Sequence, residues 1–97
     1  MAFEIVLAPE AVSELKVLPA RLRATVIDGL EKHLRYEPAK ISRSRIKRLR
    51  GMRQPQFRLR VGEVRIFYDI VGSTVEILAI VAKSEAERWL RQFGEPG

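Results

Sequence analysis

The stretch FRLRVGEVRIFYDIVGSTVEILAIV, residues 57–81, determines the expected fold. It begins with apolar residues alternating with Arg58 and Arg60, a period of two that is typical of a β-strand with one buried face. Short turns at Gly62 and at Gly72-Ser73 divide the stretch into strands over residues 57–61, 64–71 and 74–81. Because such short turns join neighbouring antiparallel strands, the stretch predicts a three-stranded antiparallel meander.

Upstream, the sequence predicts one strand and two helices. The run FEIVL, residues 3–7, is short, apolar and rich in branched side chains, as strands are. Pro9 suits the first turn of a helix over residues 9–17, and Leu18-Pro19-Ala20 ends it. A second helix over residues 20–36 has one apolar stripe, made of Leu22, Val26, Leu30 and Leu34. Since the break is short, an antiparallel helix hairpin is expected.

Two further segments complete the predicted fold. Residues 39–55 follow neither the helical nor the strand period and predict an exposed loop with room for one short helical turn. Residues 86–93 predict a closing helix, with Ser84 as its N-cap. The chain is therefore expected to be one α+β domain spanning residues 1–97, with helices on one face of a sheet. The other face, which carries Arg58 and Arg60, is expected to be open and basic.

The positive charge is concentrated in residues 40–65. This window holds ten basic side chains against Glu63 alone, a net charge of +9 in a chain whose total is +6. The remainder of the chain is therefore slightly acidic, so the molecule has a basic pole. Such a pole attracts a polyanion such as nucleic acid, or an acidic protein segment.

Several kinds of chemistry are excluded by composition. The chain has no cysteine and one histidine, His33, and its acidic residues show no metal-ligand spacing, so neither a metal nor another cofactor is expected. A packing or surface role is assigned to His33. The sequence shows no signal peptide and no apolar run near the ~20 residues of a membrane span. A cytoplasmic location without a membrane partner is therefore expected.

The remaining chemistry is that of cations. RNA can be cleaved by its own 2′-hydroxyl if a protein positions the chain and stabilises the charge that develops on the phosphate. Arg58 and Arg60 lie two residues apart and share a strand face, which suits phosphate binding or, alternatively, a solvated basic edge. Arg65 joins them only if the turn at Gly62 has the right geometry.

The basic loop is the second candidate for RNA contacts. Its basic side chains are expected to contact backbone phosphates, although an exposed solvated loop has the same composition. These residues are Arg45, Lys47, Arg48, Arg50 and Arg53. Phe67, Tyr68 and Trp89 are expected to pack in the interior rather than stack on bases.

Three segments together resemble the RelE/ParE superfamily of bacterial type II toxins. They are Leu49-Arg50-Gly51, the run FRLRVG at residues 57–62 and the run VRIFYD at residues 64–69. The similarity extends over roughly residues 3–93. It implies a small toxin that a partner antitoxin holds inactive. RelE-type members cleave messenger RNA in the ribosomal A site without a metal, by attack of the 2′-hydroxyl that leaves a cyclic phosphate.

The resemblance also implies roles for individual residues. Arg58 and Arg60 stand where RelE-type enzymes place basic strand residues, and Arg65 stands where an arginine holds the scissile phosphate. Lys83 stands beside the basic cluster that follows the last strand of the family. The family's tyrosine or histidine near the C-terminus is missing, and Trp89 cannot replace it. Lys83 and Tyr68 remain as candidates for acid–base work.

The resemblance leaves other functions open. ParE-like toxins share the fold and inhibit DNA gyrase, and a non-catalytic module for nucleic acid or an acidic peptide is a third possibility. The antitoxin is expected to be a small acidic protein that lies across Arg58, Arg60 and Lys83. Operator DNA is expected to be contacted only through the antitoxin.

Overall fold

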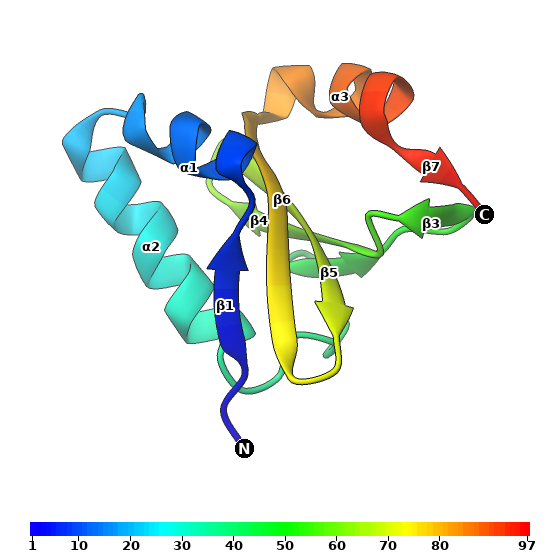
Figure 1. Ribbon diagram of the computed structural model, residues 1–97. Helices are drawn as coiled ribbons and strands as arrows, with labels where there is room; N and C mark the ends of the chain where they lie inside the picture. Colours follow the sequence, from blue (N-terminus) through cyan, green and yellow to red (C-terminus); the bar gives the residue numbers. More distant parts are fainter.

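The computed structural model describes residues 1–97 and has the expected α+β class (Figure 1). The predicted strand, helix hairpin, meander and closing helix are all present. In chain order they are β1 (Glu4–Leu7), α1 (Pro9–Lys16), α2 (Ala20–Leu34), β4 (Phe57–Val61), β5 (Val64–Val71), β6 (Thr74–Ala82) and α3 (Ala86–Phe93). None of the helices has both the length and the apolar composition that crossing a membrane requires.

The sheet has five strands in the order β1-β6-β5-β4-β2. The meander forms its centre, β1 pairs with β6 in parallel, and β2 (Ile46–Arg48) pairs with β4 in an antiparallel ladder. A separate two-stranded sheet joins β3 (Met52–Gln54) to β7 (Glu95–Pro96) near the C-terminus. The prediction that residues 39–55 form only a loop is therefore wrong, because β2 and β3 lie within it.

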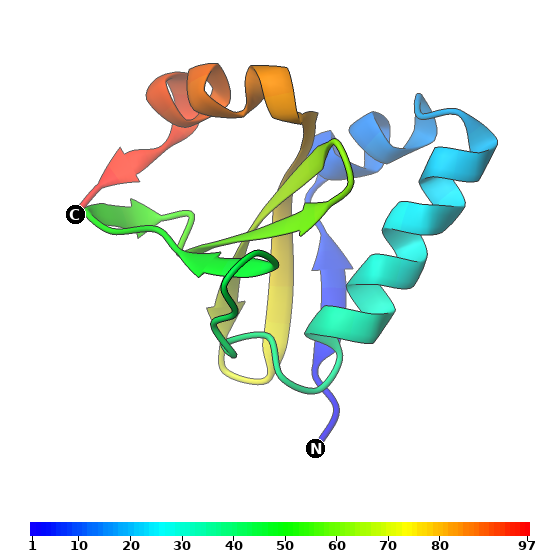
Figure 2. The ribbon, with the colours of Figure 1, turned by 180° about the vertical axis from the view of Figure 1, so that it is seen from behind.

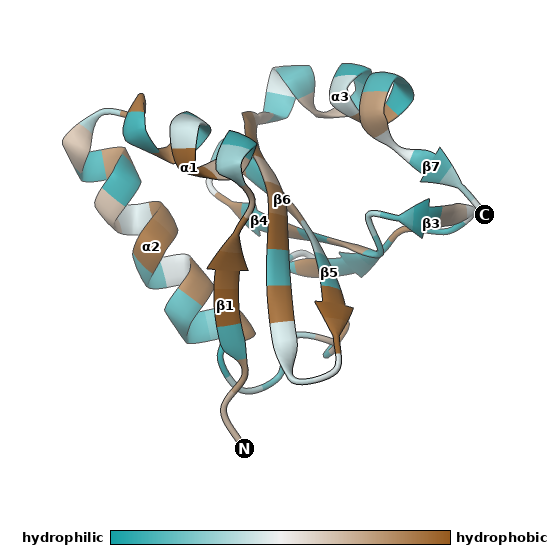
Figure 3. Ribbon diagram, viewed as in Figure 1, coloured by the Kyte–Doolittle hydropathy of each residue, from teal (hydrophilic) through white to brown (hydrophobic).

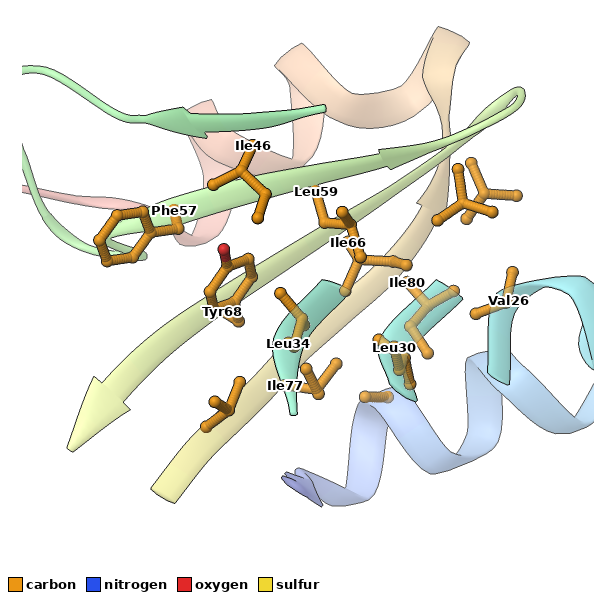
Figure 4. Close-up of a cluster of buried hydrophobic side chains, with 14 residues drawn as sticks. Val26, Leu30, Leu34, Ile46, Phe57, Leu59, Ile66, Tyr68, Ile77 and Ile80 are labelled. Carbon is orange, nitrogen blue, oxygen red and sulfur yellow. The ribbon is translucent and has the colours of Figure 1, made fainter. Parts of the chain in front are cut away.

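The main core lies between the sheet and the helix hairpin. Val26, Leu30 and Leu34 of α2 face Ile66 of β5 and Ile77 of β6 in Figure 4. The apolar stripe predicted for the second helix therefore packs on the sheet as expected. Figure 3 shows the corresponding hydrophobic residues along β1 and in bands along β6, whereas β3 and β7 are mostly hydrophilic.

Helix α3 lies on the other side of the sheet from α1 and α2 (Figures 1 and 2). Phe67 is paired with Arg58 across the ladder and so points away from the main core. Trp89 of α3 stacks on Phe67, with ring centroids 5.0 Å apart and planes within 7°. The expectation that all helices cover one face is therefore wrong for α3, because Phe67 offers an apolar contact on the opposite face.

The start of α3 also differs from the prediction. A 3₁₀ turn over Lys83–Glu85 precedes the helix, and Glu85 occupies the cap position without a side-chain hydrogen bond. Ser84 lies inside this turn, so its backbone is not in the extended conformation that an N-cap needs. Glu85 instead pairs with Arg88 one turn later.

Close packing of α2 on β4 predicts the effect of Gly29→Ala. At an exposed position inside a helix, this change stabilises the protein by about 1 kcal/mol. Here a Cβ on Gly29 would lie 2.8 Å from a methyl group of Val61. We therefore expect the free energy of unfolding in urea to fall by about 1–2 kcal/mol.

The control for this prediction is a double-mutant cycle with Val61→Ala. Removing the Val61 methyl groups relieves the overlap, so the double variant should lose less than the two single variants together. If the loss in the double variant equals the sum of the two single losses, overlap between the new Cβ and Val61 is not the cause of the destabilisation.

Candidate functional site

The β4–β5 hairpin places three arginines on one face of the sheet. Arg58 and Arg60 alternate with buried Phe57 and Leu59, and Arg60 lies directly opposite Arg65 in the ladder. Gly62, with a φ of 57°, forms the turn that produces this register. The orientation of Arg65, which the sequence left open, is therefore the same as that of Arg58 and Arg60. We call these three residues the arginine face.

The arginine face holds positive charge without acidic partners. Arg65 is only 8% exposed, and its Nη1 donates to the backbone oxygens of Gly62 and Val64 at 2.8 and 3.1 Å. The Nε atoms of Arg58 and Arg60 are buried and have no hydrogen-bond partner. No carboxylate lies within 4.0 Å of any of these guanidinium groups; the ion pairs of the chain are Glu31–Arg35, Glu37–Lys40, Arg53–Glu95 and Glu85–Arg88.

The pKa of Arg58 reflects its burial and the positive charges next to it. Burial lowers it below its usual value, and the neighbouring charges of Arg65 and Arg60 lower it further. A buried, unpartnered donor beside like charges is unfavourable in the free protein. An anion with several oxygens relieves both problems at once, because guanidinium groups bind phosphate through pairs of N–H donors. The arginine face is thus suited to a phosphate group.

Lys47 is the residue of the basic loop that joins the arginine face. It pairs with Arg58 in the β2–β4 ladder, so both side chains point to the same side of the sheet. Its side chain is exposed at the β2 edge. It therefore extends the positive surface beyond Arg58.

The other basic residues of the loop lie elsewhere. The guanidinium of Arg48 lies 5.1 Å from the ring centre of Phe57, on the core side, and donates to the backbone oxygen of Gln56. Arg53 is paired with Glu95 at 2.7 Å. Arg45 lies near the end of α2, and Arg50 is exposed in the turn that precedes Met52. The expected cluster is therefore distributed around the β2 edge.

Tyr68 is not part of the arginine face. It is fully buried on the core side, where it stacks on Phe57 and its hydroxyl donates to the backbone oxygen of Pro38 at 2.6 Å. Burial raises the pKa of Tyr68 far above its usual value, so the hydroxyl stays protonated. The expectation that Tyr68 is available for acid–base work is corrected by this position.

Lys83 lies beside the arginine face. It follows β6 directly, two residues after Val81, which is paired with Arg65. Its backbone N–H donates to the oxygen of Glu63 at 2.8 Å, which joins the end of β6 to the β4–β5 turn. The side chain is exposed and borders a hollow with Glu63 and Glu87. Lys83 is thus the lysine that the fold brings to this end of the sheet.

The burial of Tyr68 leads to a prediction about stability. Tyr68→Phe removes the hydroxyl that satisfies the backbone oxygen of Pro38, so the free energy of unfolding should fall by about 1–2 kcal/mol. Any activity of the arginine face should persist, because the hydroxyl points away from it. Tyr36→Phe is the matched control, since Tyr36 is exposed and its loss should be close to neutral in the same denaturation experiment. A loss of activity in folded Tyr68→Phe would contradict this assignment.

One buried carboxylate was not anticipated from the sequence. Asp69 is 5% exposed and accepts hydrogen bonds from the Gln54 side chain and the Gln56 backbone N–H, both at 2.7 Å. It therefore holds the β3–β4 connection against β5 instead of neutralising an arginine. No signal in the sequence identifies these partners. No cluster of histidine, aspartate and glutamate side chains could hold a metal ion.

The fold of this chain is similar to those of solved bacterial and archaeal RelE proteins. No protein-family model and no curated protein matches the chain. Among solved structures, it is similar to the Mycobacterium tuberculosis RelBE2 toxin–antitoxin complex, with 27% identity, a TM-score of 0.67 and coverage of 84% of this chain and 99% of that one.

Two further solved structures agree. The RelE–RelB complex of Pyrococcus horikoshii gives a TM-score of 0.70 at 21% identity, over 86% of this chain and 97% of that one. A mutant Escherichia coli RelE toxin in the free state gives 0.68 at 20% identity, over 96% and 99%. The chain therefore has the fold of the RelE-like toxin superfamily, which confirms the resemblance found in residues 49–69.

Proposed function

We propose that this protein is the toxin of a toxin–antitoxin pair and that it cleaves messenger RNA in the ribosomal A site. The observation that supports the proposal is the arginine face: three guanidinium groups without an acidic partner, two of them with a buried, unpartnered Nε. This surface lies on a fold shared with RelE toxins. A phosphate of the RNA backbone supplies the oxygens that these donors lack.

The proposed reaction uses the RNA as its own nucleophile. The 2′-oxygen attacks the neighbouring phosphorus, the bond from phosphorus to the 5′-oxygen breaks, and the products are a 2′,3′-cyclic phosphate and a free 5′-hydroxyl. Arg65, held by the backbone oxygen of Gly62, binds the phosphate oxygens together with Arg58 and Arg60. Fixed donors around the developing charge contribute about 3–4 kcal/mol each in comparable sites.

Proton transfer needs a different group. One proton leaves the 2′-hydroxyl and one is delivered to the departing 5′-oxygen, and arginine does neither well because its guanidinium keeps its proton under working conditions. Lys83 is the assigned donor to the leaving oxygen, because it follows the strand that pairs with Arg65. Water accepts the proton of the 2′-hydroxyl in this scheme. Placement of the codon in the A site raises the rate further by orienting the 2′-oxygen toward the phosphorus.

The proposed partner is an acidic antitoxin. The similar structures include RelB–RelE complexes, in which the toxin is bound to its antitoxin. In the present chain, carboxylates of such a partner would cover Arg58, Arg60 and Lys83. Operator DNA would be reached through the antitoxin.

A translation assay tests the proposed reaction. Purified protein is added to a bacterial translation extract with a defined mRNA, and RNA ends are mapped by primer extension. We expect cuts inside codons that disappear when ribosomes are omitted. Intact RNA with unaffected translation would refute the nuclease.

Inhibition of DNA gyrase is the second candidate. It is favoured by the positions of the tyrosines and the histidine: Tyr68 is in the core, and Tyr36 and His33 lie at the end of α2, so none of them adjoins the arginine face. A gyrase inhibitor would produce DNA breaks in cells without shortening any transcript. Measuring both outcomes in one expression experiment separates the two functions.

A further inference from the structure

A pocket of about 420 Å³ lies at the C-terminal end of α2, and none of its lining residues belongs to the arginine face. Helix α2 covers the core side of the sheet, and the chain then runs through residues 35–45 to β2 (Figure 2). The polar side chains that border the pocket come from the end of this helix and from the following segment. They are Lys32, His33, Tyr36, Glu37, Lys40, Ser42 and Arg45.

The pocket is positively charged. Lys32, Lys40 and Arg45 contribute three positive charges, and Glu37 contributes the one negative charge. Glu37 lies 3.9 Å from Lys40, but both side chains are about two-thirds exposed, so this pair is weak. The end of α2 adds only about half a negative charge. The pocket therefore favours an anion.

The imidazole of His33 lies in this positive environment. Burial lowers the pKa of its imidazole below the usual value, and the charges of Arg45 and Lys32 lower it further, against the opposing effect of Asp28. The imidazole is therefore neutral at pH 7, with one nitrogen able to donate and the other to accept a hydrogen bond. A neutral, hydrogen-bonding ring beside three cations is compatible with a phosphate and a base.

Tyr36 distinguishes a nucleotide from a simple anion. Its side chain is 66% exposed although it borders the pocket, and no hydrogen bond holds its hydroxyl. An exposed aromatic ring beside cationic side chains is the arrangement on which unpaired bases stack. An acidic peptide would pair with the cations but would gain little from the aromatic ring. The Tyr36 ring therefore favours RNA over an acidic peptide as the ligand.

We propose that this pocket binds one nucleotide of single-stranded RNA, with its base on Tyr36 and its phosphate among Lys32, Lys40 and Arg45. RNA as the ligand rests on the proposed function, but the pocket is a separate site. The backbone oxygen of Arg45 accepts a hydrogen bond from the backbone N–H of Arg60 at 2.9 Å, so one residue of the pocket and one of the arginine face are neighbours where the chain enters β2. Lys47 lies at the same edge, paired with Arg58 of the arginine face. A strand of RNA passing around the edge would contact both.

The experiment measures binding of a fluorescent, uncleavable 2′-O-methyl RNA by anisotropy at fixed salt. Lys32→Ala/Lys40→Ala should weaken binding about tenfold or more, and Tyr36→Ala about fivefold or more. Lys16→Ala/Arg21→Ala is the matched control, because it removes two exposed positive charges from α1 and α2 outside the pocket. Equal losses in the pocket and control variants would overturn the proposal, since general charge attraction would then explain binding.

A crosslink then tests the location. RNA with a single 5-iodouridine is irradiated with the protein, and we expect mass spectrometry to find the crosslink on the peptide that contains Tyr36. Crosslinks confined to Trp89 or Phe93 would overturn the proposal. So would a glutamate-rich peptide that displaces the RNA from wild type and from Tyr36→Ala equally well. Neither assay needs ribosomes or cleavage, so the site can be confirmed even if the translation assay refutes the nuclease.

Discussion

Arg65→Ala is expected to lower the rate of mRNA cleavage in a translation extract by about 10²–10³-fold. Arg65 is the most buried residue of the arginine face, and its Nη1 is fixed by the backbone oxygens of Gly62 and Val64. A guanidinium held in this way needs little reorganisation to stabilise charge on a phosphate. Alanine removes both the charge and the paired donors. The measurement is the initial rate of appearance of mapped RNA ends.

The controls separate lost chemistry from lost folding. Arg65→Lys keeps the charge but not the paired donors, so its rate should lie between those of wild type and Arg65→Ala. Arg53→Ala removes an exposed arginine that is already paired with Glu95, and we expect nearly wild-type cleavage. Circular dichroism should show folded protein in all three cases. Wild-type cleavage by folded Arg65→Ala would exclude the proposed catalytic role of this arginine.

The sequence predicts the meander well because its periodicity is long enough to interpret. Strands of five to nine residues carry enough apolar side chains for a buried face to be recognised. The strands β2, β3 and β7 have only two or three residues each, too few to show a period. They exist because distant residues pair with them, as Ile46 does with Leu59. Such pairing is a tertiary effect that local sequence does not contain.

The side of the sheet chosen by α3 has a partial signal in the sequence. Ile66, Phe67 and Tyr68 are three consecutive large apolar or aromatic residues, so at least one of them must face away from the main core. In the structure this residue is Phe67, which stacks on Trp89. The helix itself is amphipathic, but amphipathicity shows only that it needs an apolar surface, not which one. The sequence therefore does not determine which side of the sheet α3 covers.

The sequence predicts only part of the candidate site, because alternation within a strand can be read from sequence and pairing between strands cannot. The shared face of Arg58 and Arg60 follows from alternation alone, whereas that of Arg65 depends on its register opposite Arg60. For Tyr68, the expected interior packing is confirmed and the expected availability for acid–base work is wrong, because a fully buried hydroxyl cannot reach the arginine face. Its aromatic ring packs in the core, and its hydroxyl donates a hydrogen bond to the backbone oxygen of Pro38, thirty residues earlier in the chain.

Leu59→Ala should produce the largest loss of stability, about 2–5 kcal/mol in the free energy of unfolding. Leu59 is fully buried and is paired with Ile46 on one side and Ile66 on the other, so truncating its side chain leaves a cavity in the main core next to β4. Neighbouring strands restrict the backbone, so the cavity cannot collapse fully. Urea denaturation should show a lower midpoint with an unchanged slope.

The functional effect of Leu59→Ala should be small in comparison. Leu59 lies between Arg58 and Arg60 in sequence but points to the opposite side of the sheet, so the arginines keep their ladder positions. Protein that remains folded should therefore bind the uncleavable RNA with nearly wild-type affinity. Leu59→Met is the matched control, because it retains most of the volume and should cost less than about 1.5 kcal/mol. A large loss of RNA affinity in folded Leu59→Ala, at temperatures well below its midpoint, would mean that the arginine face depends on core packing as well as on backbone register.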